Sequence, residues 1–370
     1  MQRGKIAVAM SGGVDSSVAA WLLKEQGHDI FGLTALMNPA FSRCCSDADI
    51  RTAQVVCLQL GIQHHVVDVS QIFHREIIEY FFTEYLGGRT PSPCAVCNRL
   101  IKFGVLLDEA QRLGATCVAT GHYVRLETDA ENCRSPGSQT IGDLMPVRRL
   151  LRGRDKEKDQ SYFLALLTQD QLGAALFPLG EMMKSEVVAL ARRAGLSARA
   201  SKESQELCFV DDLGPGEWIT VRRLDAPGPG GIVNTHGVRI GTHRGIHHYT
   251  VGQRHGLGLA TGNRLYVIGL DAARNLVIVG DRDEACRSEM ELERVNWIAG
   301  FASAKEFRAA VQIRYRHAAA AAWVRVLDGD YVKVDFDEPQ FAVAPGQLAV
   351  FYEGDAVLGG GWIRGPRRLV

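Results

Sequence analysis

The sequence predicts an α/β fold, in which a doubly wound parallel sheet is followed by a small Gly-rich middle domain and a C-terminal antiparallel β-barrel. Short apolar runs alternate with segments of helical periodicity as far as His122. Glycine and proline become frequent from Pro215, and runs of β-branched residues separated by turns follow Leu276. A chain of 370 residues exceeds the usual size of a single core. We therefore expect three domains, at residues 1–207, 208–272 and 273–370.

The first domain is predicted from its alternation of strands and helices. Strands are expected at residues 6–10, 28–36, 63–69 and 117–120, and helices at 14–24, 50–60, 73–85 and from 97 to 113. A polar stretch without periodicity, residues 126–143, is predicted to be a surface loop, and further helices are expected at 161–167 and 184–195. Such alternation implies right-handed crossovers, with ligands bound beyond the carboxyl ends of the strands.

The composition limits the compartment and the partners. The 42 basic residues are balanced by 42 acidic ones, so a polyanion must be met by local patches such as residues 148–159, for which solvated surface is the competing explanation. No apolar run reaches the length of a membrane span, and the first residues lack the pattern of a signal peptide. We therefore expect a cytoplasmic protein with no membrane partner, whose nine cysteines form no structural disulfide framework.

The turn between the first predicted strand and helix, Ser11 to Ser17, has the composition of a phosphate cradle. Gly12 and Gly13 let backbone N–H groups turn inward, and serine hydroxyls stand at the start of a helix whose dipole favours anions. The loop has no lysine of the common P-loop kind, and Asp15 stands among the expected phosphates. A carboxylate there needs a cation between itself and the phosphates, so the sequence predicts an Mg²⁺ contact for Asp15. A tight turn with capping residues is the simpler alternative, but it does not require all seven residues.

Two other strand ends are predicted to rim the same site. Met37 follows one strand, and Gly121 and His122 follow another. Because the carboxyl ends of parallel strands meet at one edge of the sheet, we expect these residues near the glycine turn. Core packing is an equally good explanation for Met37.

Three cysteines are candidates for chemistry. Cys94 and Cys97 precede a helix and lie close to Arg99 and Lys102, a setting that favours the thiolate. Half of a zinc site is the alternative, but the chain has no second Cys-x-x-Cys, and adjacent Cys44 and Cys45 rarely face one metal. Cys208 lies at the predicted first domain boundary and is either a core residue or, if it approaches Cys97, a partner in thiol–disulfide exchange.

The chain closely resembles the bacterial tRNA-specific 2-thiouridylase family, within the PP-loop (adenine nucleotide alpha hydrolase-like) ATP pyrophosphatase superfamily. The resemblance covers nearly the whole length and depends on several motifs: residues 11–17 (SGGVDSS), 97–103 (CNRLIKF), 119–123 (ATGHY), 158–163 (KDQSYF), 207–209 (LCF), 249–254 (YTVGQR), 312–317 (QIRYRH) and 344–347 (APGQ). It implies that ATP adenylylates the C2 oxygen of the wobble uridine of tRNA, and that sulfur from a cysteine persulfide replaces that oxygen, giving 2-thiouridine, AMP and pyrophosphate. The persulfide is implied to come from a sulfur-relay or cysteine desulfurase protein.

The same resemblance implies roles for individual residues. Cys97 is the expected nucleophile, Cys208 the persulfide carrier, and Asp15 a catalytic residue that contacts Mg²⁺. The ATP site is implied at Met10, Ser11, Gly12, Gly13, Val14, Asp15, Ser16, Ser17, Met37 and Gly121. Contacts with the target base are implied at Ser92, Pro93 and Cys94, and other tRNA contacts at His122, Lys158, Asp159, Gln160, Arg314, Tyr315 and Gln347.

Three alternatives stay open at this point. A [4Fe–4S] cluster on Cys94, Cys97 and Cys208 is a minority hypothesis beside the persulfide relay. A PP-loop ATP pyrophosphatase acting on another acceptor would need neither Cys97 nor Cys208. A non-catalytic RNA-binding protein would not need the intact glycine turn.

Overall fold

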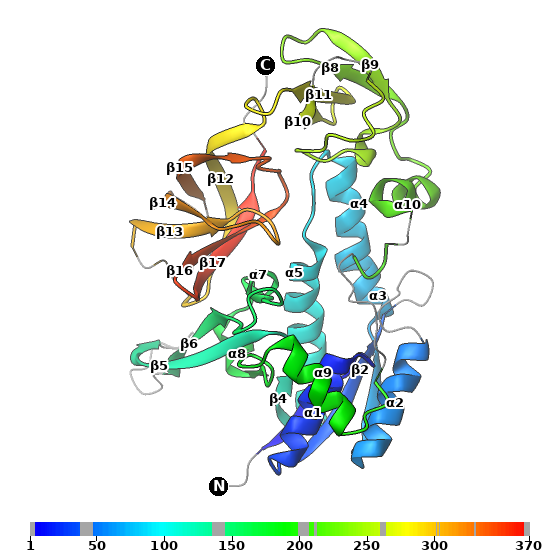
Figure 1. Cartoon of the computed structure of the whole chain (residues 1–370), viewed down its shortest axis with the longest axis vertical. Coiled ribbons are helices and arrows are strands. Elements are labelled where there is room, and N and C mark those ends of the chain that lie inside the picture. Colours follow the sequence, from blue (N-terminus) through cyan, green and yellow to red (C-terminus); the bar gives the residue numbers. More distant parts are fainter. Residues whose placement is uncertain are drawn as a thin grey trace.

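The computed structural model describes residues 4–37, 47–134, 145–198, 207–210, 213–259, 264–300, 302, 304–328 and 331–365. A parallel sheet with helices, a small middle sheet and a barrel follow one another along the chain (Figure 1). Cys44 and Cys45, considered above as a second pair of zinc ligands, lie outside the described residues.

The parallel sheet has the strand order β3-β2-β1-β4-β7, and all of its described pairings are parallel. Its inner strands are short, apolar and buried on both faces, as expected for a sheet covered by helices. The predicted doubly wound fold is confirmed. The strands are β1 (Lys5–Ala9), β2 (Ile30–Leu36), β3 (His64–Asp68), β4 (Ala115–Ala119) and β7 (Ala175–Leu176).

Helices connect and cover these strands, and two of them continue through π-helical turns. The helices are α1 (Val14–Glu25), α2 (Asp47–Leu60), α3 (Ser70–Phe73), α4 (Glu79–Leu86), α5 (Pro93–Cys97), α6 (Leu106–Arg112), α7 (Ser161–Leu164), α8 (Gln169–Gly173), α9 (Lys184–Arg193) and α10 (Gly214–Arg222). A π-helical turn at His74–Ile78 joins α3 to α4, and another at Asn98–Val105 joins α5 to α6. The helix predicted from residue 97 therefore begins earlier, because Pro93 fits the first turn of a helix. No helix among the described residues is long and apolar enough to cross a membrane.

The middle sheet has the order β10-β11-β8-β9 and lies at the far end of α4 (Figure 1). Gly88, just after α4, packs against Leu270 and Ile246 of this region. The predicted boundary at residue 272 falls between β10 and β11, so the sheet itself extends to Gly280. The elements are β8 (Gly230–Val233), β9 (Arg239–His243), a 3₁₀ turn (Ile246–His248), β10 (Tyr266–Asp271) and β11 (Leu276–Gly280).

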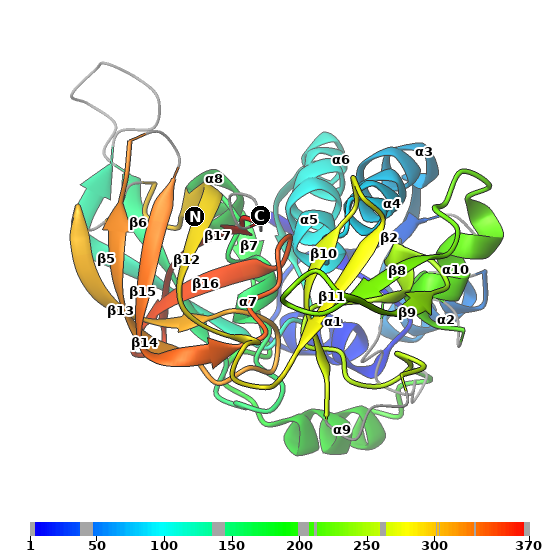
Figure 2. The same cartoon turned by 90° about the horizontal axis from the view of Figure 1, so that it is seen from above.

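The C-terminal strands close into the predicted antiparallel barrel, with the order β12-β15-β14-β13-β16-β17 and a closing β12–β17 pairing. Apolar side chains alternate inward along the strands and fill its core. Seen from above, the barrel lies beside the helices of the first domain (Figure 2). The strands are β12 (Cys286–Trp297), β13 (Glu306–Gln312), β14 (Ala320–Val326), β15 (Val332–Phe341), β16 (Leu348–Glu353) and β17 (Ala356–Ile363).

The prediction of a surface loop at residues 126–143 is wrong in its described part. Residues 126–134 form most of β5 (Val124–Arg134), which pairs with β6 (Met145–Arg152) in a hairpin, and residues 135–143 lie outside the described residues. Val124 and Leu150 are fully buried, and β6 pairs with β17 of the barrel. Burial and pairing with a distant segment thus outweigh the polar composition of this stretch.

Candidate active site

The turn between β1 and α1, residues 11–17, is called the glycine loop below. Gly12 has φ +74°, and a Cβ there would lie 2.6 Å from the carbonyl oxygen of Asp49, so a larger residue would be strained and crowded. The hydroxyls of Ser16 and Ser17 donate to the carbonyl of Gly13 at 3.1 and 2.9 Å. These contacts stabilise a tight turn at a helix N-terminus, which is the geometry that suits an anion.

Asp15, in the first turn of α1, is held by two side chains from other elements. Lys184 Nζ lies 2.7 and 2.8 Å from the two carboxylate oxygens, and the Tyr123 hydroxyl donates to one of them at 2.7 Å. Lys184 is the first residue of α9, and its backbone N–H donates to Asp155 Oδ2 at 2.9 Å. The charge of Asp15 is therefore balanced by a lysine that is distant in sequence.

The ends of β2 and β4 lie at the same edge of the sheet as the glycine loop. A Cβ on Gly121 would lie 2.8 Å from the backbone of Asp15 and Ser16, so Gly121 packs directly on the loop. Met10 and Met37 are buried, and the Thr34 hydroxyl donates to the carbonyl of Met10 at 2.9 Å. Sequence reasoning thus placed Gly121 correctly beside the loop, and Met37 in an apolar cluster is compatible with either of its two explanations.

The candidate thiols lie along α5 and near the start of α10. Cys97 is buried in the apolar cluster that also contains Phe209, and Cys208 packs against the same cluster. Cys94, Cys97 and Cys208 each carry a thiol in this structure. Both cysteines therefore contact the same large apolar cluster of the first domain, which sequence spacing alone did not indicate.

The arrangement of acidic, cysteine and histidine side chains does not fit a metal cluster. Within the described residues, which include Cys94, Cys97 and Cys208, no three such side chains are grouped closely enough to hold a metal ion. The three thiols are thus not grouped closely enough in this structure to ligate a [4Fe–4S] cluster. At Asp15, Lys184 lies where a cation would bind, so an Mg²⁺ contact there requires the lysine to move away.

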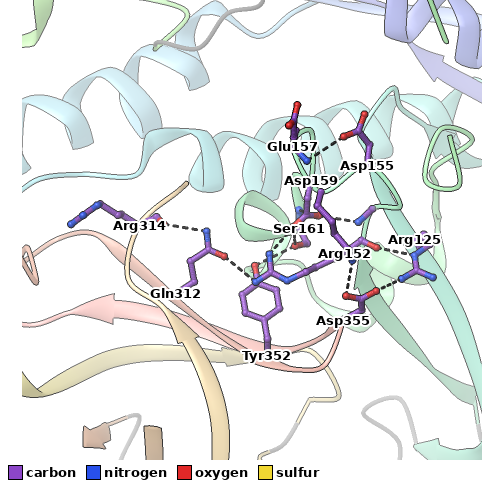
Figure 3. Close-up of polar contacts among 12 residues, drawn as sticks. Arg125, Arg152, Asp155, Glu157, Asp159, Ser161, Gln312, Arg314, Tyr352 and Asp355 are labelled. Carbon is purple, nitrogen blue, oxygen red and sulfur yellow. Dashed lines mark hydrogen bonds and ion pairs between the residues drawn. The ribbon is translucent and has the colours of Figure 1, made fainter. Parts of the chain in front are cut away.

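The turn that contains Lys158, Asp159 and Gln160 is held in place by hydrogen bonds to the buried Asp159 carboxylate. Asp159 is buried, and its carboxylate accepts from Arg152 at 2.9 Å, from the Gly153 N–H at 3.0 Å and from the Ser161 hydroxyl at 2.8 Å (Figure 3). Arg152 also stacks on Tyr352 of the barrel, 3.6 Å from the ring centroid. The predicted tRNA contact at Asp159 is therefore turned inward in this structure, whereas Lys158 and Gln160 are partly exposed.

The barrel supplies the remaining candidates for tRNA contact. Tyr315 packs on Phe163 with ring centroids 4.4 Å apart, which brings the 314–315 segment close to the 158–163 segment. Arg314 is half-buried, and its guanidinium donates to the carbonyls of Phe341 and Ala342 at 3.2 and 3.4 Å. Burial lowers the pKa of Arg314 from its ordinary value.

The loop before α5 is held by the barrel. Gln347 donates to the carbonyls of Thr90 and Pro91 at 3.0 and 3.1 Å, and the Leu348 N–H donates to the Ser92 hydroxyl at 3.4 Å. Gln347 thus positions the segment that carries the predicted base contacts Ser92, Pro93 and Cys94.

His122 is buried between two aromatic rings, Phe103 and Phe177. Its Nδ1 lies 2.8 Å from the Thr120 hydroxyl. Burial, and secondarily the charge of Lys102, hold the pKa of His122 well below its usual value. Any tRNA contact by this residue would be made by a neutral ring.

Comparison with known proteins identifies the family. Three family models match in order: one described as "tRNA methyl transferase HUP domain" at residues 4–212, one as "tRNA methyl transferase PRC-barrel domain" at 220–281, and one as "Aminomethyltransferase beta-barrel domain" at 287–363. The tRNA-specific 2-thiouridylase MnmA of Trichormus variabilis is 45% identical over 360 residues, which cover 97% of this chain and 98% of that protein. The chain belongs to the tRNA-specific 2-thiouridylase family. The relative of the same name from Roseiflexus castenholzii is 46% identical over 368 residues, covering 97% and 99%. Among solved structures, a 4-thiouridine synthetase in an RNA complex with bound ATP aligns at TM-score 0.30 and 17% identity, covering 52% of this chain and 41% of that one.

In this member of the 2-thiouridylase family, three residues that position the site were given no individual role from the sequence. Lys184, Tyr123 and Arg152 connect the glycine loop, the 158–161 turn and the barrel. Tyr123 is the last residue of the 119–123 motif, which is a signal that could have been used. Arg152 lies in the basic stretch 148–159, which indicated a candidate contact with a polyanion and not an anchor for Asp159. Lys184 carried no local signal, because it is one of many basic residues in the chain.

Proposed function

We propose that this protein is a tRNA uridine 2-sulfurtransferase that uses ATP to thiolate the wobble uridine. The observation that carries the proposal is the full-length match to 2-thiouridylases, together with Cys97 and Cys208 at one apolar cluster. Two of the family models have "methyl transferase" in their descriptions, but sulfur transfer is favoured because the relatives that match along the whole chain are named 2-thiouridylases.

The first step is activation of an inert oxygen. The C2 oxygen of uridine attacks the α-phosphorus of ATP, pyrophosphate leaves, and the oxygen becomes part of a good leaving group, AMP. The N–H groups of residues 11–17 would receive the phosphates at the N-terminus of α1. Mg²⁺ bound with ATP would neutralise charge on the departing pyrophosphate.

The second step is sulfur transfer. The terminal sulfur of a Cys208 persulfide attacks C2 and AMP departs. The Cys97 thiolate then attacks the inner sulfur of Cys208, which releases 2-thiouridine and leaves a Cys97–Cys208 disulfide. Two further reducing equivalents regenerate the thiols, which suits a cytoplasmic protein. A sulfur-relay or cysteine desulfurase protein would reload Cys208.

The tRNA is proposed to lie across the 158–160 turn and the 314–315 segment, with the target base at residues 92–94. These segments are neighbours in space, since Phe163 and Tyr315 are in ring contact and the barrel holds the loop before α5. A wobble base would have to leave the anticodon stack to reach this position, at a cost of about a few kcal/mol.

Mass spectrometry of tRNA nucleosides tests the proposal. The protein is incubated with tRNA, ATP, Mg²⁺ and a cysteine desulfurase with cysteine, and 2-thiouridine is expected from the unaltered protein but not from Cys97→Ser or Cys208→Ser. Cys286→Ser, on β12, is the matched control and should retain the product. Full turnover by both Cys97→Ser and Cys208→Ser would refute the sulfur-transfer mechanism and favour another acceptor.

A further inference from the structure

Tyr123 contacts both the glycine loop and the 158–160 turn, which are the proposed binding sites of the two substrates, ATP and tRNA. Its hydroxyl donates to Asp15 in the glycine loop at 2.7 Å. Its backbone N–H donates to Gln160 Oε1 at 3.1 Å, and its carbonyl accepts from the Gln160 N–H at 3.2 Å. One residue thus joins the proposed ATP site to the 158–160 turn, where tRNA is proposed to bind.

The connection is tightly packed on both sides. Tyr123 is buried, a Cβ on Gly153 would lie 2.6 Å from its carbonyl oxygen, and a Cβ on Gly121 would crowd Asp15. Lys184 Nζ, which pairs with Asp15, lies 5.8 Å from the centre of the Tyr123 ring. A close-packed segment has little room to absorb a displacement of Gln160 without moving the hydroxyl that holds Asp15.

The other end of the connection is equally well defined. Asp159, adjacent to Gln160, is fixed by Arg152 and by the Gly153 and Ser161 N–H groups. The turn around Gln160 is therefore held together as one packed unit. A nucleic acid that displaces the exposed part of Lys158 or Gln160 moves this unit and not a free loop.

We propose that Tyr123 is a positioning residue that couples tRNA binding at the 158–160 turn to the geometry of Asp15 in the glycine loop. This inference depends on the proposed function, because it assumes that ATP and tRNA bind at these two places. Coupling between sites is reciprocal, so nucleotide in the glycine loop must tighten tRNA binding by the same factor by which tRNA tightens nucleotide binding.

The test measures this factor at equilibrium. The Kd for tRNA is measured with and without α,β-methylene ATP, which cannot release pyrophosphate. The unaltered protein is expected to bind tRNA at least about fivefold more tightly when the analogue is present, a factor at the lower end of typical couplings. In Tyr123→Phe, which keeps the ring and loses the hydroxyl, the ratio should fall to about one, while the Kd without nucleotide stays within about twofold.

Tyr85→Phe is the matched control. Tyr85 is also buried, and the polar neighbour of its hydroxyl is Thr250, which belongs to neither loop. Its coupling ratio should equal that of the unaltered protein. An equal loss of coupling in Tyr85→Phe would overturn the proposal, because the effect would then follow from any lost buried hydroxyl.

Further outcomes are also decisive. Gln160→Ala removes the side-chain acceptor of the Tyr123 N–H, so its coupling ratio should also fall to about one. The double variant with Tyr123→Phe should show no additional loss of coupling. If circular dichroism shows that Tyr123→Phe is unfolded, Gln160→Ala serves as the test variant in its place. A normal ratio in folded Tyr123→Phe, or a ratio of one in an unaltered protein that still thiolates tRNA, would refute the coupling alone. Absence of both tRNA binding and thiolation in the unaltered protein would refute the proposed function, and the coupling with it.

Discussion

Among single residues, the ion pair between Lys184 and Asp15 controls the charge of the glycine loop. Without the ammonium, the Asp15 carboxylate would stand unneutralised where phosphates are proposed to bind. We expect Lys184→Met to lower tRNA-dependent pyrophosphate release by at least about tenfold, equivalent to about 1.4 kcal/mol. The release of pyrophosphate from ATP in the presence of tRNA is the measurement.

The control for this prediction is another lysine in an ion pair. Lys333 Nζ lies 2.7 Å from a Glu289 oxygen on the barrel surface, away from the glycine loop. Lys333→Met should leave pyrophosphate release within about twofold, because exposed pairs contribute little. If both variants behave alike, the role of Lys184 is not specific to the site.

Residue types were predictable from the sequence, but the directions of their side chains were not. The motif around Asp15 indicated an anion site, yet its cationic neighbour comes from 169 residues further along the chain. The family resemblance implied a tRNA contact at Asp159 together with Lys158 and Gln160, although the Asp159 carboxylate faces Arg152. A motif marks a segment, and only the three-dimensional packing determines which side chains of that segment face a ligand.

At the scale of elements, Gly121 lies where the end of β4 packs against α1, and there is no room for a side chain at this position. A Cβ on Gly121 would lie 2.8 Å from two backbone atoms of α1, which cannot rotate away as a side chain could. We expect Gly121→Ala to displace the glycine loop, to lower stability by about 1–3 kcal/mol and to reduce pyrophosphate release. Urea unfolding and the pyrophosphate assay measure the two effects.

Gly173, at the end of α8, is the matched control. A Cβ there meets no atom within 4 Å. Gly173→Ala should therefore be neutral or stabilise the protein by up to about 1 kcal/mol, because alanine favours the helix. Equal destabilisation in the two variants would contradict a steric origin for the Gly121 effect.

The contact between α10 and the 3₁₀ turn at residues 246–248 predicts a pH dependence of stability. His247 is buried, and its Nε2 lies 2.9 Å from the Thr220 hydroxyl. Burial, and secondarily the neighbouring His248, lower the pKa of His247 to about 4. Between pH 6.5 and pH 4, His247 is protonated in the unfolded chain but stays neutral in the folded protein. The contribution of His247 to the free energy of unfolding is therefore fully present above pH 6.5 and is lost as the pH falls toward 4.

A substitution at this position isolates the contribution of His247. Between pH 7.5 and pH 4, the fall in the free energy of unfolding should be smaller in His247→Phe than in the unaltered protein by about 3 kcal/mol. Urea titrations across this range measure it. His236→Asn, at an exposed histidine of the same sheet region, should leave the pH profile unchanged, and an unaltered profile in His247→Phe would contradict the prediction.

At the scale of the whole molecule, periodicity and composition were enough to predict a parallel sheet, a small middle region and a barrel in this order along the chain. The β5–β6 hairpin did not, because its apolar positions, such as Val124 and Leu150, are separated by polar residues and are buried only through distant partners. The pairing of β6 with β17, far along the chain, is likewise absent from any local pattern. Long-range pairing therefore determines how the barrel attaches to the first domain.

Arg152 is the residue through which this attachment reaches the site. Its guanidinium pairs with Asp159, stacks on Tyr352 and donates to Gln312 at 3.1 Å, so it joins the 158–161 turn to the barrel (Figure 3). Arg152→Met leaves the buried Asp159 carboxylate without its cation, and we expect a loss of about 3 kcal/mol in the free energy of unfolding. The Kd for tRNA should rise as well, because the two segments proposed to contact tRNA lose their common anchor.

The comparison that tests this role uses an exposed pair and a compensated double variant. Arg308 forms an ion pair with Asp337 at the surface of the barrel. Arg308→Met should lower the free energy of unfolding by less than about 1 kcal/mol. Arg152→Met combined with Asp159→Asn should be more stable than Arg152→Met alone, since the second change removes the uncompensated charge. Urea unfolding and tRNA binding are measured on the unaltered protein, the two single variants and the double variant. If Arg152 only contacted a phosphate, its loss would weaken tRNA binding without lowering the free energy of unfolding, which distinguishes this role from a structural anchor.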